Sequence, residues 1–223
     1  LSVVIPLHND EFEGMLFVRA LADAVSKIDG CEIILVDSGS IDGTLSRMHK
    51  LAAAYPQIKL VYYAQDWGVG RAAKTGVLKS SGEKILILDP KSIFSLKTFE
   101  EMQVLLDSVN VVFGKRSAPL GRVEKLVVRT FSFFASRFFG KKSDYFCIMH
   151  GFRKDVAALL FNGLLMNCDL FPVELVYKIQ KKGFSSVELQ VAGEHGALNK
   201  YSLKEKLKLP VRLFLLWIKL LRA

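Results

Sequence analysis

The sequence of 223 residues has few cysteines and no long uninterrupted apolar run. Its three cysteines, Cys31, Cys147 and Cys168, form neither an even disulfide set nor a CxxC pair, which argues against a disulfide-stapled fold and a cysteine metal site. This cysteine usage fits a reducing compartment. Because no segment offers roughly 20 consecutive apolar residues, none is expected to span a bilayer. No Pro/Gly/Ser-rich linker divides the chain, which predicts a single compact domain.

Two common phosphate-binding motifs are also missing. A third glycine follows Gly68 and Gly70 only at Gly76, so the spacing of a dinucleotide fingerprint fails, and no Walker-type loop occurs. These glycines are expected to let backbone approach a ligand or a neighbouring strand closely, or simply to form turns. The net charge of +9 would suit a nucleic-acid partner, but no nucleic-acid-binding module is recognisable and the basic residues concentrate in apolar segments. We therefore expect no nucleic-acid partner.

Three apolar runs end in polar or acidic residues. The run at 2–6 leads to Asp10, the run at 33–36 to Asp37, and the run at 84–88 to Asp89. Such runs are typical of strands buried on both faces, and the segments between them, such as 15–28 and 44–55, have helical spacing. This alternation predicts an α/β domain with a Rossmann-like, mostly parallel sheet flanked by helices.

Ligands of an open α/β sheet bind outside the carboxyl ends of its strands, so the acidic strand ends are expected to share one binding edge. Asp37 is followed at once by Ser38 and a glycine-containing turn, an arrangement that suits a nucleotide pocket. The same two residues would also suit a turn that only caps the next helix. The segment by itself leaves both interpretations open.

Two basic aromatic segments are expected to form amphipathic helices. The first, 125–139, carries Lys125, Arg129 and Arg137 within one band, and the second, 203–223, interleaves lysine and arginine with leucine and aromatic residues. Such helices can lie in the headgroup region of a membrane, where each basic residue gains on the order of 1 kcal/mol against anionic lipid. The alternative is an ordinary buried helix followed by a basic tail. We expect a main domain over 1–200 and a membrane-interfacial helix over 201–223.

Five segments together resemble a known family. They are residues 2–6 with 9–11, 36–40 with 42–44, 68–73 with Gly76, 81–86, and Phe171 with 173–175. In these segments the chain is similar to the inverting family 2 glycosyltransferases of the GT-A (nucleotide-diphospho-sugar transferase) fold. The similarity is greatest to the branch that glycosylates dolichyl and other polyprenyl phosphates, including the dolichyl-phosphate glucosyltransferases.

The resemblance implies a hexosyltransferase that moves a hexose from UDP-glucose or GDP-mannose to a polyprenyl or dolichyl phosphate. It implies association with the cytosolic face of a membrane, which in a eukaryote would be the endoplasmic reticulum. It also implies catalytic roles for Asp89 and Glu174 and acceptor-phosphate roles for Arg116 and Arg129. The donor-binding residues that it implies are Pro6, His8, Asp10, Asp37, Ser38, Gly70 and Lys91.

The chain departs from the family pattern at three places. The Asp-x-Asp metal motif of the family reads Asp89-Pro90-Lys91, so Asp89 is left as a weak metal ligand and a Mg²⁺ or Mn²⁺ site is expected to be weakened or absent. Lys91 would pair with the diphosphate as a point charge or remain a solvated lysine. Pro172 replaces an aspartate, and Ile148 stands where the family tends to have glycine. These departures support a second interpretation, a catalytically impaired GT-A protein with a binding or assembly role.

Overall fold

Strands and helices alternate along the chain in the computed structural model, which describes residues 1–90, 95–116, 122–139, 149–168, 170–191, 211 and 214–220. The strands are β1 (Ser2–Leu7), β2 (Glu32–Asp37), β3 (Ile58–Tyr62), β4 (Lys84–Leu88), β5 (Val111–Arg116), β6 (Met149–Arg153) and β7 (Ser186–Val191). The helices are α1 (Glu13–Val25), α2 (Thr44–Ala54), α3 (Val69–Lys79), α4 (Leu96–Ser108), α5 (Arg122–Phe139), α6 (Lys154–Asn162) and α7 (Phe171–Lys182). The predicted α/β alternation is confirmed.

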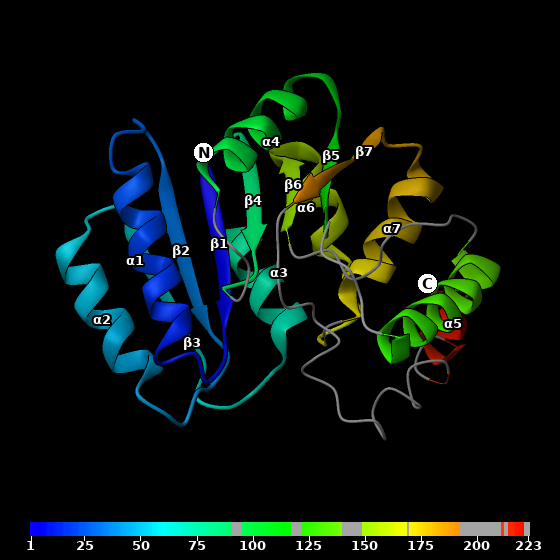
Figure 1. Cartoon of the computed structure of the whole chain (residues 1–223), viewed down its shortest axis with the longest axis horizontal. Helices are drawn as coiled ribbons and strands as arrows, with labels where there is room; N and C mark the ends of the chain where they lie inside the picture. The colour runs from blue at the N-terminus through cyan, green and yellow to red at the C-terminus, as the bar shows by residue number, and fades with distance from the viewer. Residues whose placement is uncertain are drawn as a thin grey trace.

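A seven-stranded sheet in the order β3-β2-β1-β4-β6-β5-β7 forms the centre of the molecule (Figure 1). β3, β2, β1 and β4 pair in parallel, and so do β5 and β7, while β6 is antiparallel to both of its neighbours. The prediction of a mostly parallel sheet is therefore confirmed. Because β1 lies between β2 and β4, the loops that follow these three strands meet at one edge, which is the lower edge in Figure 1.

Helices cover both faces of the sheet. The apolar residues of α1, α2 and α4 pack on one face, and those of α3, α5, α6 and α7 pack on the other. Successive strand residues point to opposite faces of the sheet. Val3 therefore packs on the face covered by α1, α2 and α4, and Val4 packs on the face covered by α3, α5, α6 and α7. Burial on both sides explains why these strands have continuous apolar runs.

The carboxyl-terminal end of the chain is described only in part. Residues 214–220 are helical, which agrees with a helix near the carboxyl terminus. The rest of the segment 203–223, apart from Val211, lies outside the described residues, as does the predicted domain boundary near residue 200. The domain division stays a prediction.

At the edge of the sheet opposite to the three acidic strand ends, Glu32 joins the beginnings of several strands. This side chain is buried, and its carboxylate accepts hydrogen bonds from the Ser2 hydroxyl, from the Ser81 N–H and hydroxyl at 2.6 and 2.7 Å, and from the Lys59 ammonium at 2.6 Å. Burial by itself would raise the pKa of Glu32, but the hydrogen bonds from Lys59, Ser2 and Ser81 outweigh it and lower the pKa to about 2.

We expect the substitution Glu32→Gln to remove an acid-sensitive part of the stability. The pKa of Glu32 in the folded state lies below its ordinary value of 4.5, so the charged group stabilises the fold above that value, and this contribution is lost as the pH falls toward about 2. The shift corresponds to roughly 3 kcal/mol at most. Urea unfolding at neutral and at acidic pH measures the effect. The wild-type protein should lose more free energy of unfolding on acidification than the variant, and equal losses would contradict the role given to Glu32.

Candidate functional site

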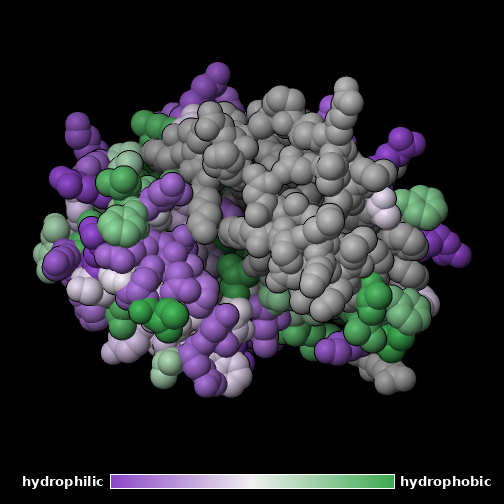
Figure 2. All heavy atoms as spheres, turned by 60° about the horizontal axis from the view of Figure 1, so that its bottom comes forward, coloured by the Kyte–Doolittle hydropathy of each residue, from purple (hydrophilic) through white to green (hydrophobic). Residues whose placement is uncertain are grey.

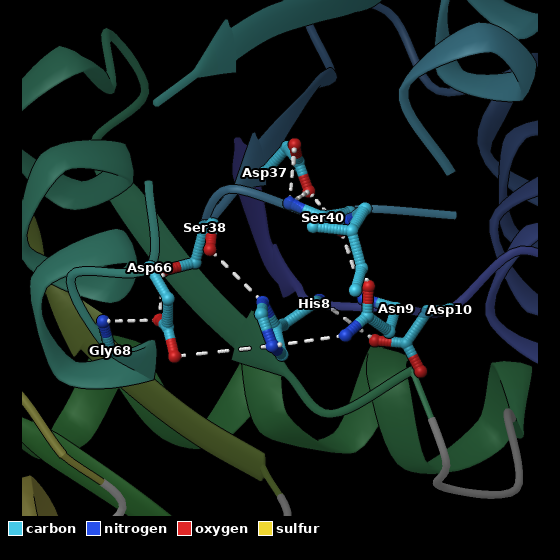
Figure 3. A network of polar contacts seen from close by, with 9 residues as sticks. His8, Asn9, Asp10, Asp37, Ser38, Ser40, Asp66 and Gly68 are labelled. Atoms are coloured by element: carbon cyan, nitrogen blue, oxygen red, sulfur yellow. Dashed lines mark hydrogen bonds and ion pairs between the residues drawn. The ribbon is translucent and has the colours of Figure 1, made fainter. Parts of the chain in front are cut away.

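Asp37 lies at the centre of a polar network on the carboxyl edge of the sheet (Figure 3). It is the last residue of β2, it is 1% exposed, and it faces Leu7 of β1 in the strand register. Its two carboxylate oxygens lie 3.3 and 3.2 Å from the Ser40 nitrogen, whose N–H they accept, and the Ser40 hydroxyl also donates to Asp37. These bonds fix the turn that follows β2. Asp37 therefore stabilises this turn, as one of the two interpretations of the sequence predicted. Its donor-binding role stays a prediction.

Ser38 and His8 extend this network to the loop after β3. The Ser38 hydroxyl donates to Oδ1 of Asp66 at 3.0 Å, and the Ser38 carbonyl oxygen lies 3.0 Å from Nδ1 of His8. The other oxygen of Asp66 lies 3.9 Å from Nε2 of His8. Asp66 also accepts the N–H of Gly68 at 2.7 Å, just before α3 begins. The network thus connects the ends of β1 and β2 with the start of α3 (Figure 3).

The loops after β1 and β2 are tied to each other by further hydrogen bonds. Asp10 is 8% exposed, accepts the N–H of His8 at 3.0 Å, and donates its own N–H to the Thr44 hydroxyl at 2.8 Å. Asn9 has a φ of 53° and accepts the N–H of Ile41 at 3.0 Å. Polar groups held in this way are preorganised, so a ligand would not have to order them on binding.

Pro6 precedes these loops and is buried inside β1, opposite Val36. β1 pairs with β4 only from Ser2 to Val4, so the missing N–H of Pro6 lies beyond that ladder. The structure brings Asp37, Ser38, His8 and Asp10 together at one edge of the sheet, as their positions at strand ends predict. Figure 2 shows the same edge of the molecule, where the surface over α1 and α2 is mainly hydrophilic with single hydrophobic side chains between.

Asp89 follows β4 directly and is half-buried. Because β4 is separated from β2 only by β1, Asp89 and Asp37 belong to the same edge of the sheet. Lys91 and Ile148 lie outside the described residues. Arg116 is the last residue of β5. Arg129 is exposed on α5. Figure 1 shows this helix near α7 and away from β2 and β3.

The glycine segment faces the backbone of the loop after α6. The N–H of Gly70 donates to the Asn167 carbonyl oxygen at 2.8 Å, and a Cβ at Gly70 would lie 2.4 Å from the Met166 carbonyl oxygen. The backbone at Gly70 therefore lies close to other backbone, as expected, and that backbone belongs to the loop after α6. The space beside Gly70 is filled by the chain itself, and its donor-binding role stays a prediction.

Glu174 anchors the same loop from the first turn of α7. Its side chain is 0% exposed, and its oxygens accept the N–H of Leu165 at 2.9 and 3.1 Å and the N–H of Met166 at 2.8 Å. Lys178, one turn further along α7, forms an ion pair with it at 2.6 Å. Pro172 occupies the start of the helix, where a missing N–H costs nothing. This geometry gives Glu174 a structural role, while its catalytic role stays a prediction.

The described residues do not form a metal site by themselves. Nowhere in the described ranges do three or more His, Cys, Asp or Glu side chains gather closely enough to hold a metal ion. Asp89 supplies one carboxylate, whereas Mg²⁺ and Mn²⁺ need several oxygen ligands. Diphosphate oxygens and water are the usual further ligands of these ions.

Two residues of this region were not predicted from the sequence. Asp66 stands two residues before Gly68, and its bond to the Gly68 N–H is an Asx turn, a pattern that an Asp-x-Gly sequence favours. His150 lies in β6 with its ring buried among phenylalanine rings. No local motif indicates His150, because its surroundings come from strands distant in the sequence.

An open α/β sheet with helices on both faces and a preorganised polar network at its carboxyl edge defines a Rossmann-like domain, a class whose ligands bind at that edge. Residues 2–160 match Glycosyl transferase family 2, and the chain belongs to this family. The resemblance noted from the sequence motifs is thus confirmed.

The chain is similar to proteins named dolichyl-phosphate beta-glucosyltransferase. It is 26% identical over 216 residues to dolichyl-phosphate beta-glucosyltransferase of Dictyostelium discoideum, covering 86% of this chain and 65% of that protein. It is 26% identical over 208 residues to the mouse (Mus musculus) protein of the same name, covering 81% and 63%. The chain therefore spans slightly less than two thirds of the length of these two relatives.

Solved structures share the fold. The complex of glucosyl-3-phosphoglycerate synthase from Mycobacterium tuberculosis with uridine-diphosphate superposes with a TM-score of 0.70 at 19% identity, covering 98% of this chain and 78% of that one. This similarity shows that the chain has the GT-A fold. Within the described residues, no helix has both the length and the apolar character needed to cross a bilayer.

Proposed function

We propose that this chain transfers a hexose from a nucleotide sugar, UDP-glucose or GDP-mannose, to a polyprenyl or dolichyl phosphate. The observation that carries the proposal is the network around Asp37, which is preorganised at the same sheet edge as Asp89. The relatives named dolichyl-phosphate beta-glucosyltransferase support the acceptor class and favour glucose. The uridine-diphosphate in the solved structure of similar fold favours UDP-glucose over GDP-mannose.

Each candidate residue has a proposed task. Asp37 and Ser38 hold the base or ribose of the nucleotide, and His8 stacks or hydrogen-bonds beside it. Asp89 faces the diphosphate, and Arg116 and Arg129 hold the acceptor phosphate. Because a polyprenyl phosphate is already ionised, the transfer needs positioning of the acceptor more than its deprotonation. This requirement fits a chain with Pro172 in place of an aspartate.

In this proposal a divalent ion would be bound jointly by the protein and by the diphosphate of the substrate. Asp89 and the diphosphate oxygens would hold Mg²⁺ or Mn²⁺, and the ion would stabilise negative charge on the leaving nucleotide. Lys91 would contribute a point charge to the same diphosphate. The alternative function, a GT-A protein that binds nucleotide without transfer, is favoured by the single carboxylate that Asp89 provides.

The proposed acceptor requires contact with a membrane surface. On α5, Lys125, Arg129, Phe133 and Arg137 follow each other at intervals of four residues, and all four side chains are exposed. This stripe combines cations with an aromatic ring, as interfacial helices do. Exposed apolar residues near the carboxyl terminus, including Phe214 and Leu215, extend the proposal to that segment. Flotation with anionic and neutral vesicles tests it, and equal binding to both would contradict a role for the cations.

Titration calorimetry with UDP and GDP, each with and without Mn²⁺, tests the donor site, and transfer to a short polyprenyl phosphate tests the reaction. Binding without transfer would support the alternative function.

We expect Asp37→Asn to weaken nucleotide affinity by roughly 10-fold to 100-fold, because hydrogen bonds to a charged group contribute about 1.5–3 kcal/mol. Asp42→Asn, an exposed carboxylate in the same turn, is the matched control and should leave affinity unchanged. An equal loss in both variants would mean that the turn as a whole, and not Asp37, determines binding.

A further inference from the structure

His150 is a polar side chain in an apolar, aromatic environment. It lies in β6 opposite Ile87 of β4 and Phe113 of β5, and it is 3% exposed. Its ring centroid lies 5.9 Å from that of Phe113, 6.3 Å from that of Phe152 and 5.7 Å from that of Phe171. A phenylalanine would suit such surroundings well, so the imidazole calls for an explanation.

One nitrogen of this ring is unsatisfied. Within the part of the chain that the structure describes, Nε2 of His150 is buried and has no hydrogen-bond partner. Burying a polar nitrogen without a partner costs stability, and buried polar groups in native proteins are nearly always paired. An unpaired buried group of this kind is commonly explained by a functional role, by stored strain, or by a bound water or ion.

Asp89 is a charged residue that directly follows the neighbouring strand β4. It stands two residues after Ile87, the β4 partner of His150, so strand alternation directs both side chains to the same face of the sheet. Burial lowers the pKa of His150 to about 4, and the negative charge of Asp89 acts against this shift.

We propose that His150 is a positioning residue that orients Asp89 in the nucleotide-bound state. Its Nε2–H donates to one carboxylate oxygen of Asp89 and leaves the other oxygen to face the diphosphate. Carboxylates that hold metal ions or phosphates are commonly fixed by a second hydrogen bond of this kind, and losing the supporting group typically weakens binding 10-fold to 100-fold. The inference rests on the proposed function, because it assigns the diphosphate to Asp89.

The substitution His150→Phe tests the proposal because it moves stability and affinity in opposite directions. It keeps an aromatic ring in the cluster and removes the unpaired nitrogen, so the melting temperature should stay the same or rise. The affinity for UDP, measured by calorimetry with and without Mn²⁺, should fall at least 10-fold. His150→Gln restores an N–H donor and should recover most of the affinity. A core residue without a positioning role would change affinity only in proportion to lost stability.

Two further measurements separate the possible outcomes. Phe152→Leu is the matched control, because it perturbs the same aromatic cluster without a polar group, and it should lower the melting temperature while UDP affinity stays unchanged. In wild-type protein with ¹⁵N-labelled histidine, UDP should shift the Nε2 resonance of His150, and Asp89→Asn should reduce this shift. Unchanged affinity in His150→Phe would overturn the inference alone. Failure of the wild-type protein to bind UDP would contradict the proposed function and this inference with it.

Discussion

Glu174→Ala is expected to lower the free energy of unfolding by about 3–5 kcal/mol, because it breaks a buried ion pair by removing one partner. The Glu174 carboxylate is 0% exposed and accepts the N–H groups of Leu165 and Met166. Its loss leaves these two donors without their acceptor and removes the ion-pair partner of the largely buried Lys178 ammonium, which keeps its hydrogen bond to the Gly163 carbonyl oxygen. Urea unfolding followed by circular dichroism measures the loss.

The control for this prediction is a carboxylate in an exposed pair of the same spacing. Glu101 pairs with Lys97 at 3.8 Å on the surface of α4, so Glu101→Ala should cost only about 0.5 kcal/mol or less. A catalytic role for Glu174 predicts something different for Glu174→Gln, namely loss of transfer at unchanged stability and UDP affinity. A structural role predicts that stability and affinity fall together. Unchanged stability in Glu174→Ala would contradict the structural role.

The fold was predictable because its signal is local. Strands buried on both faces require continuous apolar residues, so the runs ending at Asp37 and Asp89 identified β2 and β4 and their common edge. The helical spacing of 15–28 and 44–55 likewise identified α1 and α2, with ends that differ by a few residues. Helix ends depend on capping and tertiary contacts, which periodicity does not record.

The site was predictable only where it coincides with strand ends. His8, Asp10, Asp37 and Ser38 follow or end consecutive parallel strands, so their convergence follows from the topology. His150 lies on β6, which runs antiparallel between β4 and β5, and its place opposite Ile87, two residues before Asp89, depends on that pairing. Pairing of strands separated by about 60 residues leaves no mark in a local pattern, which is why this residue was not identified.

Gly68→Ala is expected to destabilise the fold by about 3–5 kcal/mol, from backbone strain and steric overlap together. Gly68 has a φ of 84°, a conformation that other residues rarely adopt, and a Cβ there would lie 2.1 Å from the Asn167 carbonyl oxygen. The obstacle is backbone that Glu174 holds in place through Leu165 and Met166, so it cannot move aside at low cost. Thermal and urea unfolding of the variant measure the effect.

Gly183→Ala separates strain from overlap, because Gly183 has a similar φ of 71° but no atom within 4 Å of the position of a Cβ. This control should cost only about 1–2 kcal/mol. The N–H of Gly68 also donates to Asp66, which accepts the Ser38 hydroxyl, so Gly68→Ala should disturb the network at Asp37 and weaken UDP binding. Gly183 ends α7 and should leave UDP affinity unchanged. If both variants lost the same stability and neither lost affinity, the close contact between the glycine segment and the loop after α6 would have no part in shaping the donor site.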